Sequence, residues 1–156
     1  MRSAATPLSV LLLVVILAGC SPTRPGELTR EDFDEGMRAL AEGDLETVDR
    51  VADRLRERDP AEPLVPFFRG MLARRRGDAE GAEVLFNEFY ASAYDRYVKG
   101  YAELSIHDRG LIQTARAAAL EVSYLYIEEN RYMDANLFNI LVDDFDAVVK
   151  HGGAGR

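Results

Sequence analysis

The sequence predicts an all-α protein of about six helices, arranged as antiparallel hairpins stacked into a short solenoid, with essentially no strand. Two observations carry this prediction. A window of 14 residues recurs with an offset of 34, and apolar residues follow three-four spacing along most of the chain. A period of 34 is typical of a helix-turn-helix unit, which cannot bury its apolar face alone and therefore stacks on its neighbours.

The repeat consists of seven identities between two windows of the chain. The residues Phe33, Gly36, Met37, Ala39, Gly43, Asp44 and Glu46 recur as Phe67, Gly70, Met71, Ala73, Gly77, Asp78 and Glu80. Similar residue types extend the register, since Val48 corresponds to Ala82 and Val51 to Leu85. The two windows therefore predict two hairpins of the same design.

The first helix is expected to begin with Thr29 and Asp32, which form a capping-box pattern. Residues 21–28 contain two prolines and a glycine without an apolar period, and this predicts a linker.

Tight turns are predicted at the two Gly-Asp pairs. Gly43 and Gly77 supply the left-handed backbone that ends a helix. Asp44 and Asp78 then accept hydrogen bonds from the free amides of the next helix.

The second half of the chain is predicted to contain a long helix and a third hairpin. Apolar spacing extends the helix that begins near Asp78 to about Ser105, and residues 107–110 break it. Helices near 111–129 and 132–150 follow. This third unit fits the repeat only with an insertion of 19 residues and with Asn130 in place of the turn glycine.

The repeat resembles the tetratricopeptide family. That resemblance places Gly36 and Gly70 at the family's small position between the two helices of a hairpin, and Asp59-Pro60 at its closing Asp-Pro. Asp32 and Pro66 replace the family's aromatic residue, so the repeats are degenerate. The resemblance implies a protein-binding role.

The first 20 residues form a second pattern. An apolar run from Leu8 to Leu17 follows Arg2 and ends in Ala18-Gly19-Cys20. The run is too short to span a membrane and is typical of a signal peptide. It resembles the lipobox of bacterial lipoproteins, which implies cleavage before Cys20 and a lipid on its thiol. The alternative is an ordinary signal peptide with an incidental thiol.

These patterns divide the chain into four parts. They are a lipoprotein signal peptide over 1–19, a lipidated linker over 20–28, a helical domain over 29–151 and a flexible tail over 152–156. Ser21 after the cysteine points to the outer membrane, with the domain in the periplasm. With one cysteine in the chain, no disulfide is expected.

The formal net charge of −8 argues against nucleic acid as a partner. Membrane contact is therefore expected through the lipid anchor.

Tyrosines supply the candidate partner-binding residues. Tyr90, Tyr94, Tyr97 and Tyr101 share a face of the long helix, and Tyr126 lies on the next helix. They form either core packing with hydroxyls at the rim or a groove of the amphipathic side chains that are enriched in binding hot spots.

Other charged groups give weaker patterns. The cluster Arg69, Arg74, Arg75 and Arg76 is expected to pair with acids such as Asp78 and Glu80, with an acidic partner or phosphate as the alternative. Asp143, Asp144 and Asp146 lack the spacing of a calcium loop, and His107 and His151 lie in no metal motif. No catalytic, metal or cofactor motif is found, and no enzyme is expected.

The sequence thus predicts a lipid-anchored adaptor or scaffold for a protein partner in an envelope assembly such as a secretion, pilus, export or outer-membrane machine. A ligand-holding accessory protein of a transport system is the alternative, with the tyrosines lining its pocket. The oligomeric state stays open.

Overall fold

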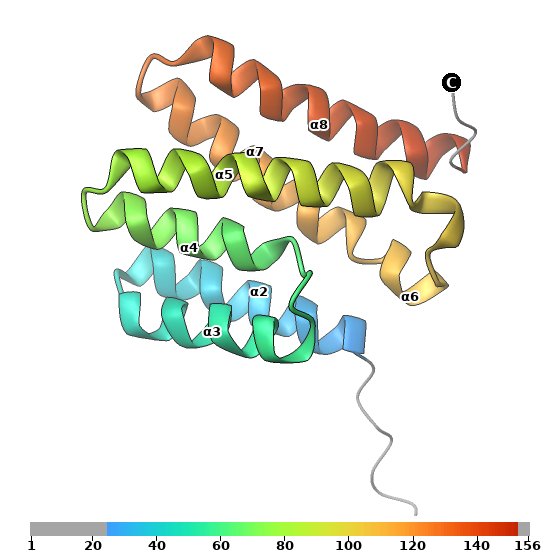
Figure 1. Cartoon of the computed structure of the whole chain (residues 1–156), viewed down its shortest axis with the longest axis horizontal. Coiled ribbons are helices and arrows are strands. Elements are labelled where there is room, and N and C mark those ends of the chain that lie inside the picture. The colour runs from blue at the N-terminus through green and yellow to red at the C-terminus, as the bar shows by residue number, and fades with distance from the viewer. Residues whose placement is uncertain (1–24, 153–156) are drawn as a thin grey trace, which may run out of the picture.

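The computed structural model describes residues 25–152, which fold into three antiparallel helix hairpins stacked in layers (Figure 1). The hairpins are α2 (Pro25–Glu42) with α3 (Leu45–Arg58), α4 (Leu64–Arg75) with α5 (Ala79–Ala93), and α7 (Ile112–Glu128) with α8 (Tyr132–His151). Within residues 25–152 there is no strand. The prediction of an all-α, repeat-like array of about six helices is confirmed.

The three hairpin turns have the same backbone geometry. The turn residue is left-handed in each, with φ of 77° at Gly43, 85° at Gly77 and 59° at Asn130. The following amide donates to the carbonyl five residues back, from Asp44 to Ala39 (2.9 Å), from Asp78 to Ala73 (2.9 Å) and from Arg131 to Tyr126 (2.8 Å). This is a common way to satisfy the last carbonyls of a helix. The predicted turns, with Asn130 replacing glycine, are confirmed.

The two aspartates after the turn glycines cap the next helix as predicted. An Asp44 carboxylate oxygen accepts from the Thr47 amide at 3.1 Å, and an Asp78 oxygen accepts from the Gly81 amide at 2.9 Å. At the third turn the equivalent residue is Arg131, whose side chain makes no cap bond. The identical residues in the two windows therefore correspond to two turns with the same backbone conformation and the same aspartate helix cap.

Two repeat glycines allow close packing between helices. A Cβ built on Gly36 would lie 2.4 Å from the Phe68 ring, and one on Gly70 would lie 2.6 Å from the Phe86 ring. Real atoms do not approach so closely, so a larger residue would push the rings away. This explains why both repeats have glycine at this position.

A chain of aromatic contacts runs through the core from the first hairpin to the last. The successive centroid distances are 6.1 Å from Phe33 to Phe67, 5.6 Å from Phe67 to Phe89, 6.3 Å from Phe89 to Phe138 and 5.9 Å from Phe138 to Tyr126. All five rings are buried. Because Phe33 and Phe67 are repeat partners, the identity between the windows marks this shared core position.

The start of α2 differs from the prediction. The helix begins at Pro25 and includes Leu28, so only part of the expected linker lies outside it. Thr29 is inside the helix and buried, so the capping box was wrong. Proline suits the first helical position because that position needs no amide hydrogen. At the other end Gly152, with φ of 64°, closes α8, and residues 153–156 are outside the described part of the chain.

The long helix predicted to run to about Ser105 is interrupted, because α5 ends at Ala93. After α5 the chain winds into a π-helix, η1 (Tyr94–Lys99), in which Gly100 donates from its amide to the Asp95 carbonyl at 2.9 Å. It continues through the short 3₁₀ segment η2 (Tyr101–Glu103) and the four-residue α6 (Ile106–Arg109). A glycine and a widened turn stop the helix although the apolar spacing continues.

Candidate functional site

The five candidate tyrosines divide into three buried and two half-buried rings. Tyr97, Tyr101 and Tyr126 are buried, whereas Tyr90 and Tyr94 are half-buried. Tyr97 packs edge-on against Phe145 at 6.3 Å, and Tyr126 packs against Phe86 at 6.1 Å. Burial raises the pKa of Tyr126 to about 12 and also raises the pKa of Tyr97. The buried three are core residues rather than a partner surface.

The chain's own cations cover several of these rings. Arg131 lies 4.6 Å from the Tyr126 centroid and Arg109 lies 4.8 Å from that of Tyr101. Lys99 lies 5.3 Å from the Tyr94 centroid, and Tyr90 stacks on Tyr94. Tyr101 lies on η2, after the break at Gly100, whereas Tyr90, Tyr94 and Tyr97 lie on α5 and η1. The three buried tyrosines therefore follow the core-packing alternative, and Tyr90 and Tyr94 keep partly exposed rings.

The basic cluster makes contacts across the layers instead of pairing with Asp78 and Glu80. The contacts are Arg69 with Asp53 (2.9 Å), Arg74 with Glu129, Arg75 with the Leu40 carbonyl (3.3 Å) and Arg76 with Asp49 (3.9 Å). Since α4 lies in the middle layer, its arginines face acids of both neighbouring hairpins, and Asp78 is engaged as a helix cap. The expected pairing of the cluster with acids is confirmed for Arg69, Arg74 and Arg76, but the named partners were wrong.

The acidic triplet and the histidines do not form a metal site. Asp146 accepts two hydrogen bonds from Arg116, at 2.7 and 3.0 Å. Within residues 25–152 no three His, Cys, Asp or Glu side chains are grouped closely enough to hold a metal ion. His107 lies on α6, and His151 is the last residue of α8.

A buried carboxylate, Glu62, was missed by sequence reasoning. It is 3% exposed, and one carboxylate oxygen accepts from the Leu64 amide at 3.3 Å. Its other oxygen lies 3.7 Å from Arg96, which donates to Asp59 at 2.6 Å. Burial raises the pKa of Glu62 more than attraction to Arg96 lowers it.

A raised pKa is typical of a general acid, but the Glu62 carboxylate is buried and therefore not accessible to a substrate. Because the side chain is enclosed, its contacts are those of a structural group that ties η1 to the connection between α3 and α4. In the sequence, Glu62 directly precedes Pro63 and the start of α4. This position was the one sequence feature that could have pointed to a buried carboxylate.

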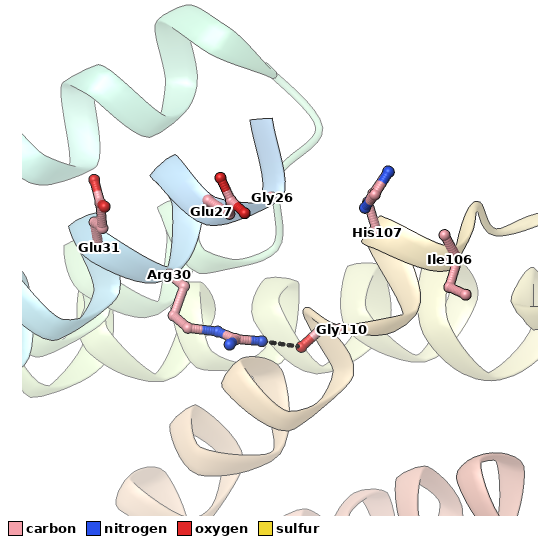
Figure 2. A pocket seen from close by; sticks show the side chains of 7 residues that line it. All are labelled: Gly26, Glu27, Arg30, Glu31, Ile106, His107 and Gly110. Carbon is pink, nitrogen blue, oxygen red and sulfur yellow. Dashed lines mark hydrogen bonds between the residues drawn. The ribbon is translucent and has the colours of Figure 1, made fainter. Parts of the chain in front are cut away.

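A cleft of about 360 Å³ lies between the start of α2 and α6 (Figure 2). It is lined by Gly26, Glu27, Arg30, Glu31, Ile106, His107 and Gly110. Arg30 donates to the Gly110 carbonyl at 3.1 Å, a bond that joins two segments 80 residues apart. The cleft combines two carboxylates with one guanidinium and an imidazole, and this mixture selects no ligand class.

The most distinctive exposed feature is apolar and lies on the last hairpin. We name it the end face and define it by Tyr124 and Ile127 on α7 and Met133, Leu137 and Ile140 on α8. Met133 is 89% exposed, Tyr124 56% and Ile140 46%. The α8 members are spaced i, i+4, i+7 and therefore share a side of the helix. Sequence reasoning missed this face because its residues fit the core pattern.

The register of the hairpin sets the heights of the end-face residues along the two helices. Ser123 on α7 donates to Asn139 on α8 at 2.9 Å, and this contact sets Tyr124 level with the segment around Leu137. Large apolar side chains that gather on the surface of a soluble protein often mark an interaction site. The end face is thus the best candidate site in the described part of the chain.

Comparison with known proteins found no match. No family model matches the chain, and no curated protein or solved structure is significantly similar to it. None of the helices within residues 25–152 combines the length and the apolar character needed to cross a membrane. Cys20, the predicted lipidation site, lies outside the described residues.

Proposed function

We propose that this protein is an outer-membrane lipoprotein whose periplasmic domain is an adaptor that binds a protein partner in an envelope assembly. The observation that carries the proposal is the end face, five of the seven large apolar side chains that are exposed on α7 and α8. The Leu17-Ala18-Gly19-Cys20 pattern supports the anchor.

The placement of the first and last layers supports an adaptor. The domain begins with α2 in the layer at one side of the stack, and α8 lies in the layer at the opposite side (Figure 1). An anchor on Cys20 would be five residues from the start of α2. The end face would then be directed away from the anchored layer, where a partner can reach it.

The ligand-holding alternative has less support. It requires a pocket lined by tyrosines, but Tyr97 and Tyr126 are packed against phenylalanines and Tyr101 is covered by Arg109. The cleft between α2 and α6 contains no tyrosine.

Metabolic labelling with a palmitate analogue tests the anchor. We expect label in the wild-type protein and recovery in the outer-membrane fraction, whereas Cys20→Ser should lose the label and remain as precursor or leave that fraction. Unchanged labelling of Cys20→Ser would contradict the proposal.

Photo-crosslinking in living cells tests the adaptor role. A photoreactive residue in place of Met133 should give a discrete protein adduct, and the same residue in place of Arg38, exposed on α2, should not. Identical adduct patterns at the two positions would argue against a role for the end face.

A further inference from the structure

The chemistry of the end face also indicates which kind of partner it takes. We propose that it binds an amphipathic helix of another protein, one whose apolar stripe is flanked by lysine and arginine. This inference rests on the proposed adaptor function and goes further by stating the shape and charge of the partner segment.

The stacking of the array favours a helix as the occupant. In this fold the hairpin α2–α3 is covered by α4, and α4–α5 is covered by α7, so each hairpin is followed by a helix laid across it. The described chain has no such helix after α8. Met133 and Ile140 are separated by about 10 Å at 1.5 Å per residue, so a partner helix of roughly 10 to 14 residues would cover the end face.

The charge around the end face favours a basic partner. Residues 112–151, which comprise α7, α8 and the turn between them, contain seven Asp and Glu residues against three Lys and Arg residues. Arg116 is paired with Asp146 at 2.7 Å, and Arg131 is paired with Asp134 at 2.8 Å. The acids that take part in none of the described ion pairs are Glu121, Glu128, Asp143 and Asp144.

These four acids lie three or four residues from Tyr124 or Ile140 and so border the end face as an acidic rim. This rim disfavours the other occupants. A second copy of the chain would bring an identical acidic rim against the first, and like charges across an interface oppose association. An anionic membrane surface has the same sign as the rim. A helix with basic flanks places cations against the free carboxylates and its apolar stripe against the apolar side chains.

Peptide binding to the full chain tests the inference. The chain contains no tryptophan, so a single tryptophan in an 18-residue model peptide reports binding by fluorescence. Three peptides are compared: a leucine stripe with lysine flanks, the same stripe with glutamate flanks, and a scramble of the lysine peptide that has no apolar face. The protein is held in phosphatidylcholine nanodiscs, with empty nanodiscs as the blank.

We expect the lysine peptide to bind at least about tenfold more tightly than the glutamate peptide and the scramble. Ile140→Asn should weaken its binding by about tenfold or more, because it places a polar group in the apolar contact. Val84→Asn is the matched control, since Val84 is an exposed apolar residue on α5, outside the end face, and its change should leave the affinity unchanged.

Three outcomes would overturn the inference. Equal binding of the lysine peptide to wild type and Ile140→Asn would show attraction by charge alone. Equal binding of the lysine and glutamate peptides would show that basic flanks do not contribute to recognition. Self-association of the wild-type chain in sedimentation, abolished by Ile140→Asn, would assign the face to a second copy.

The experiment is independent of the anchor. Either the apolar segment or a lipid on Cys20 holds the chain in the disc, so a failure of lipidation leaves the peptide measurement valid. A Met133 adduct in cells without lysine preference in vitro would contradict the basic partner and leave the adaptor role standing.

Discussion

The first and last hairpins are the two ends of the array, and their surfaces are built differently. Helices α2 and α3 are joined by ion pairs around Asp32, which accepts from Arg54 at 2.7 Å and from Arg58. Helices α7 and α8 are joined mainly by apolar packing around Phe138, with the Arg116–Asp146 ion pair and the Ser123–Asn139 hydrogen bond beside it. Every exposed large apolar side chain among the described residues lies at Val84 or later in the chain.

This difference shows how a stacked array treats its ends. Each inner hairpin is covered on both sides, but a terminal hairpin must present one face to water or to a partner. The first hairpin presents charged residues and so acts as a cap. The last hairpin presents the end face, as an inner hairpin would, and this asymmetry is the basis for the proposed partner site.

The largest expected effect comes from truncating the core of the last hairpin. Phe138 is buried and contacts three other rings, those of Phe89, Tyr90 and Tyr126. Phe138→Ala should lower the free energy of unfolding by about 3–5 kcal/mol, because it removes buried area and leaves a cavity. Urea unfolding followed by circular dichroism measures the loss, which should be the same in 1 M NaCl.

Phe138→Leu is the matched control for that experiment. It keeps most of the apolar volume and should cost less than about 1.5 kcal/mol. Equal losses for the leucine and alanine variants would mean that α8 does not pack on the core through this ring.

A smaller and salt-dependent effect is expected in the first hairpin. Asp32→Asn keeps the shape of the side chain but removes the charge that faces two arginines. We expect a loss of about 1–2 kcal/mol at low salt, below the upper range for charged hydrogen bonds because both arginines are partly exposed. The same urea measurement in 1 M NaCl should show a reduced difference between variant and wild type. A loss independent of salt would contradict the contrast between the two ends.

The last comparison concerns two glycines that share a backbone conformation at different depths of the fold, and it includes the smallest expected effect. Gly77 joins α4 to α5 in the middle layer, and Gly152 only closes α8. Gly77→Val should cost about 1–2 kcal/mol because a β-branched residue resists positive φ. Gly152→Val should cost less, since a terminal turn can fray without disturbing the core. Thermal melting measures both, and equal shifts would argue against the central role of the second turn.

Most of the fold followed from local patterns in the sequence. The identities 34 residues apart located two turns with their caps, and Asn130 was recognised because few other residues accept left-handed backbone. Three-four spacing identified the helices of the third hairpin within one or two residues at each end. These features depend on residues close in the chain, so local chemistry is enough to predict them.

The tertiary structure alone decided which apolar and charged side chains are covered. Tyr97 and Ile140 fit the same helical pattern, yet Tyr97 is buried because α8 lies on it, and Ile140 is exposed because no described helix follows α8. Arg74 forms an ion pair with Glu129 rather than with nearby Asp78, because stacking brings α7 beside α4. Periodicity shows that a helix has an apolar face, whereas only the packing of distant segments determines whether that face is core or surface.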